Sequence, residues 1–354
     1  MSPTFAPGLE LSRQFYTDAV LPALDRHYPG LSHAAGRIGW GSDVLGFDTE
    51  MSADHGWGPI VQFFLSDDDA ELAEPIDEML MRELPEEFSG YPVRFPAPDS
   101  IAPVRHWVQI STVRRYWQEW LAVDIDQQIR VADWLTIPSQ RLGTLTGGAV
   151  HHDGIGELTR IREAFARYPD AIRLYLLAAG WQRIGQEEHL MPRAGFVGDE
   201  LGSSVIGGRL VREVMLLSLL LAGHYPPYAK WFGSAFARLP DIGPLGEVLR
   251  RVQLAEFWPE RNAAIGEALS LLAHRHNALG LTEPLNTELT DFHERPFRQI
   301  AGSENAAVIL TAIADPGIRA LADRQVLGGI DQLTDSTDLL EASHLRPALT
   351  HLYD

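Results

Sequence analysis

Hydrophobic and polar positions follow two different patterns along this chain, and the change from one to the other divides it. Residues 9–27 place apolar side chains on roughly one face at helical spacing, which predicts a helix, and further helices are expected at about 67–84 and 113–121. Short apolar runs between these helices are typical of strands. Strands are expected at 38–40, 60–65, 91–95 and 106–112. This order of elements indicates a small α+β domain over residues 1–128.

After about residue 128 the pattern becomes helical. Residues 150–154 predict a small hairpin, and later apolar positions recur at helical spacing between Pro and Gly residues, which predicts a series of helices. These helices are expected at 158–168, 170–190, 202–222, 227–238, 244–253 and 259–279. A mainly α-helical domain is therefore expected over 129–294. A C-terminal helical extension with a short strand at 297–300 is expected over 295–354.

Composition and charge argue against several classes of function, including nucleic-acid binding and thiol catalysis. The chain has 29 basic and 48 acidic residues, for a formal net charge of -19, and this balance argues against a nucleic-acid partner. The absence of Cys excludes disulfides and a thiol nucleophile. The longest apolar run, 214–222, is too short to cross a bilayer, and the first residues do not resemble a signal peptide. We therefore expect a cytoplasmic protein with no membrane partner.

The candidate chemistry lies in residues 39–59, a stretch rich in glycine, acids and aromatic residues that leads into the predicted strand at 60–65. A tight turn at Gly41 and Ser42 lets the backbone approach a phosphate closely, and Ser42 adds a hydroxyl donor. Acids that follow at a short distance, such as Asp54, can hold Mg²⁺ beside that phosphate. The alternative is an ordinary solvated loop, because Gly, Ser and Asp are common in turns.

The spacing of Gly41, Ser42 and Asp54 resembles the signature of the DNA polymerase beta-like nucleotidyltransferase superfamily. Within it, the text of residues 41–59 is most similar to an uncharacterised bacterial family, domain of unknown function 4037. Further stretches that resemble the family are 133–135, 148–153, 225–231 and 295–297. The resemblance implies a nucleotidyltransferase-like first domain that uses Mg²⁺ and a nucleoside triphosphate, with ATP as the expected nucleotide.

The sequence departs from this signature at its second acid, because position 56 is Gly56. The neighbouring strand, where a third carboxylate is expected, offers Gln109 as an oxygen ligand and no acid. Asp43, Asp48 and Glu50 are close in sequence and are candidates to complete a metal site. We assign Asp54 and Glu50 as metal ligands, and Asp54 and Ser42 as the residues that carry the chemistry.

Basic residues of the helical part are candidates for phosphate contacts. Lys230 is the single lysine of the chain, and its ammonium suits a triphosphate, although most lysines are simply exposed. We assign Gly41, Ser42, Lys230 and Arg193 to nucleotide binding. His151 and His152 are not expected to share one metal ion, because neighbouring residues of a strand point to opposite faces.

Two classes of function fit these residues. The first is an enzyme that transfers a nucleoside monophosphate from a nucleoside triphosphate to a small-molecule acceptor. The second is a nucleotide-binding or regulatory module that has lost transfer activity with the acid at position 56. A third possibility is different small-metabolite chemistry in the same place. The acceptor, the base preference and the oligomeric state do not follow from the sequence.

Overall fold

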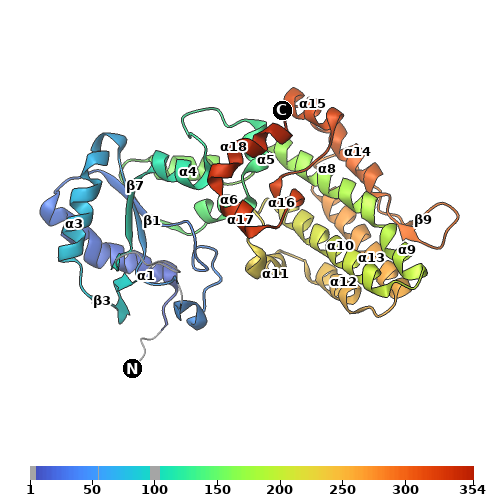
Figure 1. The fold of residues 1–354 in the computed structure, drawn as a ribbon, viewed down its shortest axis with the longest axis horizontal. Helices are drawn as coiled ribbons and strands as arrows, with labels where there is room; N and C mark the ends of the chain where they lie inside the picture. The colour runs from blue at the N-terminus through green and yellow to red at the C-terminus, as the bar shows by residue number, and fades with distance from the viewer. Residues whose placement is uncertain (1–4, 55, 96–103) are drawn as a thin grey trace. The chain divides into compact units, whose positions relative to one another are not determined.

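The computed structural model describes residues 5–54, 56–95 and 104–354 and, of Asp54, the backbone alone. The chain forms two compact units (Figure 1). The first comprises residues 1–129, 140–166 and 343–347. The second comprises residues 130–139, 167–342 and 348–354. The units therefore differ from the ranges predicted from sequence patterns, because two later segments of the chain return to the first unit.

The first unit is built on a four-stranded mixed sheet of order β7-β2-β1-β8. Its strands are β1 (His33–Arg37), β2 (Val61–Leu65), β7 (Val108–Thr112) and β8 (Ala149–Asp153). β1 runs antiparallel to both β2 and β8, whereas β2 and β7 are parallel, with Gln62 opposite Gln109. The parallel pair is joined by a helical crossover, as parallel strands require.

Helices bury both faces of this sheet. All five residues of β1 and all five of β2 are buried. On one face, Phe63 and Leu65 pack with side chains such as Phe15 and Leu80 from the covering helices, and burial of each is worth about 1.5–3 kcal/mol. On the other face, Phe64 meets the ring of Tyr116 edge-on. The helices of this unit are α1 (Gly8–Phe15), the π-helical η1 (Tyr16–Val20), α2 (Leu21–His27), η3 (Asp67–Leu72), α3 (Ala73–Glu83), α4 (Val113–Leu121), α6 (Ser139–Thr146) and α7 (Glu157–Ala164).

Three strand predictions differ from the structure. The strand expected at 38–40 was wrong, because β1 ends at Arg37 and Gly39 turns the chain with a φ of +89°. The hairpin expected at 150–154 is a single strand, β8, which pairs with β1. The strand expected at 91–95 is two short strands outside the main sheet. The short pairs are β3 (Glu87–Phe88) with β4 (Tyr91–Pro92), and β5 (Arg94–Phe95) with β6 (Arg105–His106).

The second unit is mainly helical, so the chain as a whole is α+β, as predicted. Its longest helices correspond closely to the segments that Pro and Gly residues delimit in the sequence. They are α8 (Asp170–Glu187), α10 (Glu200–Leu221), α12 (Gly243–Leu254) and α13 (Trp258–Ala278). The shorter ones are α5 (Val131–Thr136), α9 (Leu190–Phe196), α11 (Ala229–Ala237), α14 (Gly302–Thr311), α15 (Pro316–Arg324), α16 (Ile330–Leu333) and α17 (Thr337–Glu341).

Glycines let two of these helices approach closely. A Cβ at Gly302 would lie 2.7 Å from the backbone nitrogen of Gly185, so α14 packs directly against α8. The buried carboxylate of Glu188 accepts hydrogen bonds from the N–H groups of Ile300 (2.7 Å) and Gly302 (2.8 Å) at the start of α14. Among the described residues, no helix combines the length and apolar character that a membrane crossing needs.

Candidate functional site

The turn that follows β1 is shaped by two glycines with positive φ. Gly39 has φ +89° and Gly41 has φ +135°. A Cβ at Gly39 would collide with the hydroxyl of Tyr116, and one at Gly41 would collide with the side chains of Arg37 and Asp43. Because an L-residue is disfavoured at both positions by conformation and by space, the tight bend of residues 39–42 depends on glycine.

A buried ion pair supports this turn from within. The side chain of Arg37 has no exposed surface, and that of Asp43 is 2% exposed. The guanidinium donates to both carboxylate oxygens of Asp43, at 2.6 and 2.9 Å. It also donates to the carbonyls of Ile38 (3.1 Å) and Trp40 (2.8 Å). This bidentate geometry satisfies both charges, so the turn is wrapped around a neutral, rigid pair.

The turn contains hydrogen-bond donors that have no partner among the described residues. Among the described residues, no hydrogen bond engages the N–H groups of Gly41 and Ser42 or the hydroxyl of Ser42. Both residues are half-buried. Successive N–H groups without a partner, next to a hydroxyl, can serve as donors to an anion.

Two of the acids considered as additional metal ligands are engaged elsewhere. Asp43 is committed to Arg37. Asp48 accepts hydrogen bonds from the N–H of Gly8 at the start of α1 (2.7 Å) and from the indole N–H of Trp57 (3.2 Å). A carboxylate at a helix N-terminus is stabilised by the helix dipole, so Asp48 holds α1 against the loop. The loop after the turn is therefore structured by its own acids.

The assigned metal ligands lie in the short 3₁₀ helix η2 (Glu50–Asp54). Glu50 is exposed at its first residue. The side chain of Asp54 and the whole of His55 lie outside the described part of the chain, so Asp54 stays a prediction as metal ligand and catalytic residue. Gly56 has φ +61°, a conformation that glycine adopts without strain. Among the described side chains, no three acids or histidines are placed to hold a metal ion.

A chain of amide hydrogen bonds determines what Gln109 can do. The N–H of Ile38 donates to Oε1 of Gln62 (2.9 Å), which orients that fully buried amide. Nε2 of Gln62 then donates to Oε1 of Gln109 (2.8 Å). The oxygen of Gln109 is thus already an acceptor, and its Nε2 has no partner among the described residues. Gln109 therefore presents an amide donor at this place, while its oxygen already accepts one hydrogen bond; its role as an oxygen ligand stays a prediction.

The two basic residues assigned to nucleotide binding belong to the second unit. Lys230 is exposed at the start of α11, and its Nζ lies 4.8 Å from the centre of the Trp231 ring, a cation–π geometry. Arg193 is exposed in α9. These surroundings agree with ordinary surface cations. Their contact with a nucleotide stays a prediction.

A β-bulge changes the expectation for His151 and His152. The pairing of β1 with β8 shifts register between Ala35 and Gly36, and His151 is the extra residue. Both imidazole rings consequently lie beside Tyr16, with centroids 6.1 and 6.4 Å from its ring. The two side chains therefore do not alternate at this bulge, whereas the expectation that they do not share a metal ion stays a prediction. Burial lowers the pKa of His151 to about 4, with Arg13 and Arg37 adding repulsion, so its ring is neutral and shares a 2.9 Å hydrogen bond with Ser12.

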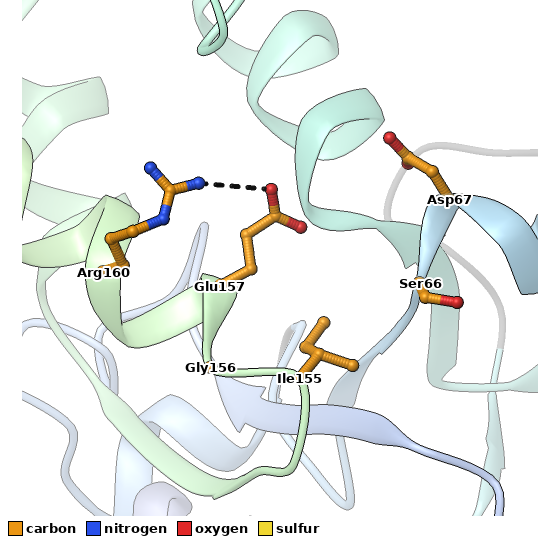
Figure 2. A pocket seen from close by; sticks show the side chains of 6 residues that line it. All are labelled: Ser66, Asp67, Ile155, Gly156, Glu157 and Arg160. Carbon is orange, nitrogen blue, oxygen red and sulfur yellow. Dashed lines mark hydrogen bonds and ion pairs between the residues drawn. The ribbon is translucent and has the colours of Figure 1, made fainter.

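A separate pocket of about 470 Å³ lies at the other end of the sheet (Figure 2). Ser66 and Asp67, directly after β2, face the beginning of α7 across it, where Glu157 pairs with Arg160 at 3.5 Å. Burial, with a contribution from Asp67, raises the pKa of Glu157. The 39–42 turn does not line this pocket. The two features are therefore distinct, and the turn is the better match to the chemistry expected from the sequence.

Sequence reasoning located Gly41 and Ser42 but missed Arg37 and Gln62. Arg37 lies two residues before the turn and could have been paired with Asp43 only if the bend between them had been known. Gln62 stands out as the single polar residue in the apolar run 60–65. A buried amide in a strand must find hydrogen-bond partners, so that position carried a usable signal.

Comparisons with known proteins find one family that matches part of the chain and one distantly similar solved structure. A family model described as "Domain of unknown function (DUF4037)" matches residues 134–232, less than a third of the chain and outside the 39–42 turn. No curated protein matches the sequence. A solved structure described as a nucleotidyltransferase-like protein from Exiguobacterium sibiricum is 14% identical, covering 88% of this chain and 91% of that chain, with a TM-score of 0.33. Likeness at this level carries no argument about activity.

Proposed function

We propose that the first unit binds the phosphates of a nucleoside triphosphate at the 39–42 turn. The observation that carries this proposal is the set of free donors at Gly41 and Ser42, held over the buried Arg37–Asp43 pair. Rigid donors favour anion binding because little order has to be imposed when the ligand arrives. The resemblance of the sequence to nucleotidyltransferases indicates the same ligand.

The form of this function that the geometry supports best is a nucleotide-binding or regulatory module. Transfer of a nucleotidyl group requires carboxylates that hold metal ions on both the attacking and the leaving oxygen. In the described part of the chain, Asp43 and Asp48 have structural partners, Gln109 presents a donor, and position 56 has no side chain. These residues do not form a two-metal site.

The second candidate is Mg²⁺-dependent transfer of a nucleoside monophosphate to a small-molecule acceptor. The placement of Glu50 and Asp54 in one short helix after the turn favours it. In this candidate Asp54 and Glu50 would hold the metal, Ser42 would contact the phosphates, and Lys230 and Arg193 would neutralise charge. Acceptors that are small or basic suit the acidic protein better than nucleic acid does.

Thermal unfolding with ATP, GTP, CTP or UTP, each with and without Mg²⁺, tests the proposal. A ligand present at 100 times its Kd stabilises the folded protein by about 2.7 kcal/mol, which a melting curve resolves. We expect a nucleotide-dependent shift that Ser42→Ala reduces. Ser204→Ala, at an exposed serine of α10, is the matched control and should retain the full shift.

The outcomes separate the two candidates. A shift without Mg²⁺, together with no release of pyrophosphate, supports the binding module. A shift that requires Mg²⁺ and disappears in Asp54→Ala, with pyrophosphate released in the presence of an acceptor, supports transfer. If no nucleotide raises the melting temperature under either condition, the proposal is wrong.

A further inference from the structure

Aromatic side chains gather at the same end of the sheet as the 39–42 turn. Trp40 is part of the turn itself, Trp107 immediately precedes β7, and Phe95 ends β5. Phe95 stacks on Trp107 with centroids 5.0 Å apart and an angle of 14°, and Trp40 meets Trp107 edge-on at 5.5 Å. The three side chains are half-buried, so they are not part of the closed core.

This cluster is held in place by specific contacts. The indole N–H of Trp107 donates to the carbonyl of Phe95 (2.9 Å), which fixes the orientation of its ring. A Cβ at Gly58 would lie 3.1 Å from the Phe95 ring, so that ring rests on the backbone leading into β2. The cluster therefore joins the turn, the start of β7 and the connection that follows Asp54.

At least one indole face has no ring against it. The guanidinium of Arg37 lies 5.6 Å from the centre of the Trp40 ring, and Phe95 covers one face of Trp107. One face of each indole remains. The two indole rings meet at 75°, so the edge of one ring points at a face of the other. This contact covers one of the two faces that remain. The last face has no ring partner among the described residues.

A polar group lies next to the aromatic cluster. Gln109 is two residues after Trp107, which forms a bend directly before β7, so the two Cα atoms lie within about 7 Å of each other. Its Nε2 is the donor left over by the Gln62 hydrogen bond. A planar aromatic surface beside an amide donor suits a planar ligand that has acceptor atoms on its edge.

We propose that Trp40 and Trp107 stack against the base of the bound nucleotide and that Gln109 donates to an acceptor on the edge of that base. This inference rests on the proposed function, because the 39–42 turn would hold the phosphates of the same ligand. Trp40 lies next to Gly41 in the chain, so the base and phosphate sites are neighbours. Stacking accepts any base, because every base has an aromatic face, whereas the Gln109 donor favours bases with an acceptor atom at the matching edge position.

Calorimetric titration of the full chain with ATP, inorganic tripolyphosphate and adenosine tests the inference. Base–aromatic stacking strengthens binding by roughly tenfold, so we expect ATP to bind about tenfold more tightly than tripolyphosphate. Trp107→Leu should remove this advantage and leave tripolyphosphate affinity unchanged. Trp107→Phe retains a ring and should keep part of the affinity difference between ATP and tripolyphosphate. Trp258→Leu, at a half-buried indole of the second unit, should keep all of it.

The quenching of tryptophan fluorescence by adenosine alone gives a second measurement that does not involve phosphate. We expect quenching in the unmodified protein and in Trp258→Leu, and much less in Trp107→Leu. Circular dichroism establishes that each variant is folded. If ATP and tripolyphosphate bind equally tightly and adenosine does not quench, the base site is wrong while the phosphate site stands. If none of the three ligands binds, both the inference and the proposed function are wrong.

Discussion

Gly41→Ala is expected to be among the most damaging single substitutions in the first unit. The residue has φ +135°, and a strained backbone of this kind costs about 1–3 kcal/mol for a residue other than glycine. The new Cβ would also collide with both members of the Arg37–Asp43 pair. Separating a buried ion pair costs about 3–5 kcal/mol, because each charge loses its partner without gaining water.

The two costs together exceed about 4 kcal/mol, a large fraction of the 5–15 kcal/mol that stabilises an ordinary domain. Urea unfolding followed by far-ultraviolet circular dichroism measures the change in the free energy of unfolding. Gly30→Ala is the matched control: its φ is +81°, but nothing lies within 4 Å of a Cβ there. It should lose only about 1–2 kcal/mol.

The same reasoning applies to the pair itself. Asp43→Asn should cost about 3–5 kcal/mol, because it leaves the guanidinium of Arg37 buried without a counter-charge. The double variant Arg37→Met, Asp43→Leu should recover much of this loss, since it removes both charges together. If Gly41→Ala is no more destabilising than Gly30→Ala, the buried pair does not support the turn and the reasoning fails.

Three further predictions concern charged and titratable groups. Asp48→Asn should lower the free energy of unfolding by about 1 kcal/mol in thermal denaturation, because it weakens the cap on α1; an unchanged melting temperature would contradict this role. The pKa of His151 is lowered to about 4 in the folded state, below the unfolded value of about 6.5, so protons bind the unfolded chain first. The contribution of His151 to stability should fall by on the order of 1–3 kcal/mol from pH 6.5 to pH 4, and His151→Gln should remove this part of the slope; an identical pH profile would refute it. Burial raises the pKa of Glu213, so its ionised form is costly at neutral pH, and Glu213→Gln should raise the melting temperature there; a lower value would show that the charge is stabilising.

The helices of the fold could be predicted largely from the sequence. The segment expected at 259–279 is α13 (Trp258–Ala278), and that expected at 113–121 is α4. α13 has Pro259 in its first turn and Gly280 after its end, α4 is capped by Thr112, and both carry a recurring apolar face. Local signals are read directly from the chain, so the prediction needed no knowledge of tertiary contacts.

One of the two central strands of the sheet, β1, could not be predicted in this way. β1 has the sequence His-Ala-Ala-Gly-Arg, without β-branched or aromatic residues. It is a strand because β2 and β8 pair with it on both sides, and its small side chains fit beneath the covering helices. Pairing partners that lie about 30 and 115 residues away leave no mark in the local pattern.

The candidate site was predicted in part for the same reason. Gly41 and Ser42 carry a recognisable spacing. The Arg37–Asp43 pair depends on the path of the turn between them, and the donor role of Gln109 depends on the parallel register that places it opposite Gln62. The ion pair and the alignment of the two glutamines are determined by tertiary structure, so local sequence patterns do not predict them.

A crystal structure of the protein with a non-hydrolysable nucleoside triphosphate tests the central claim most directly. The account predicts that phosphate oxygens lie within hydrogen-bonding distance, about 2.7–3.2 Å, of the N–H groups of Gly41 and Ser42. The Arg37–Asp43 pair should remain intact beneath them. A nucleotide bound at another place, with these N–H groups facing water, would contradict the account.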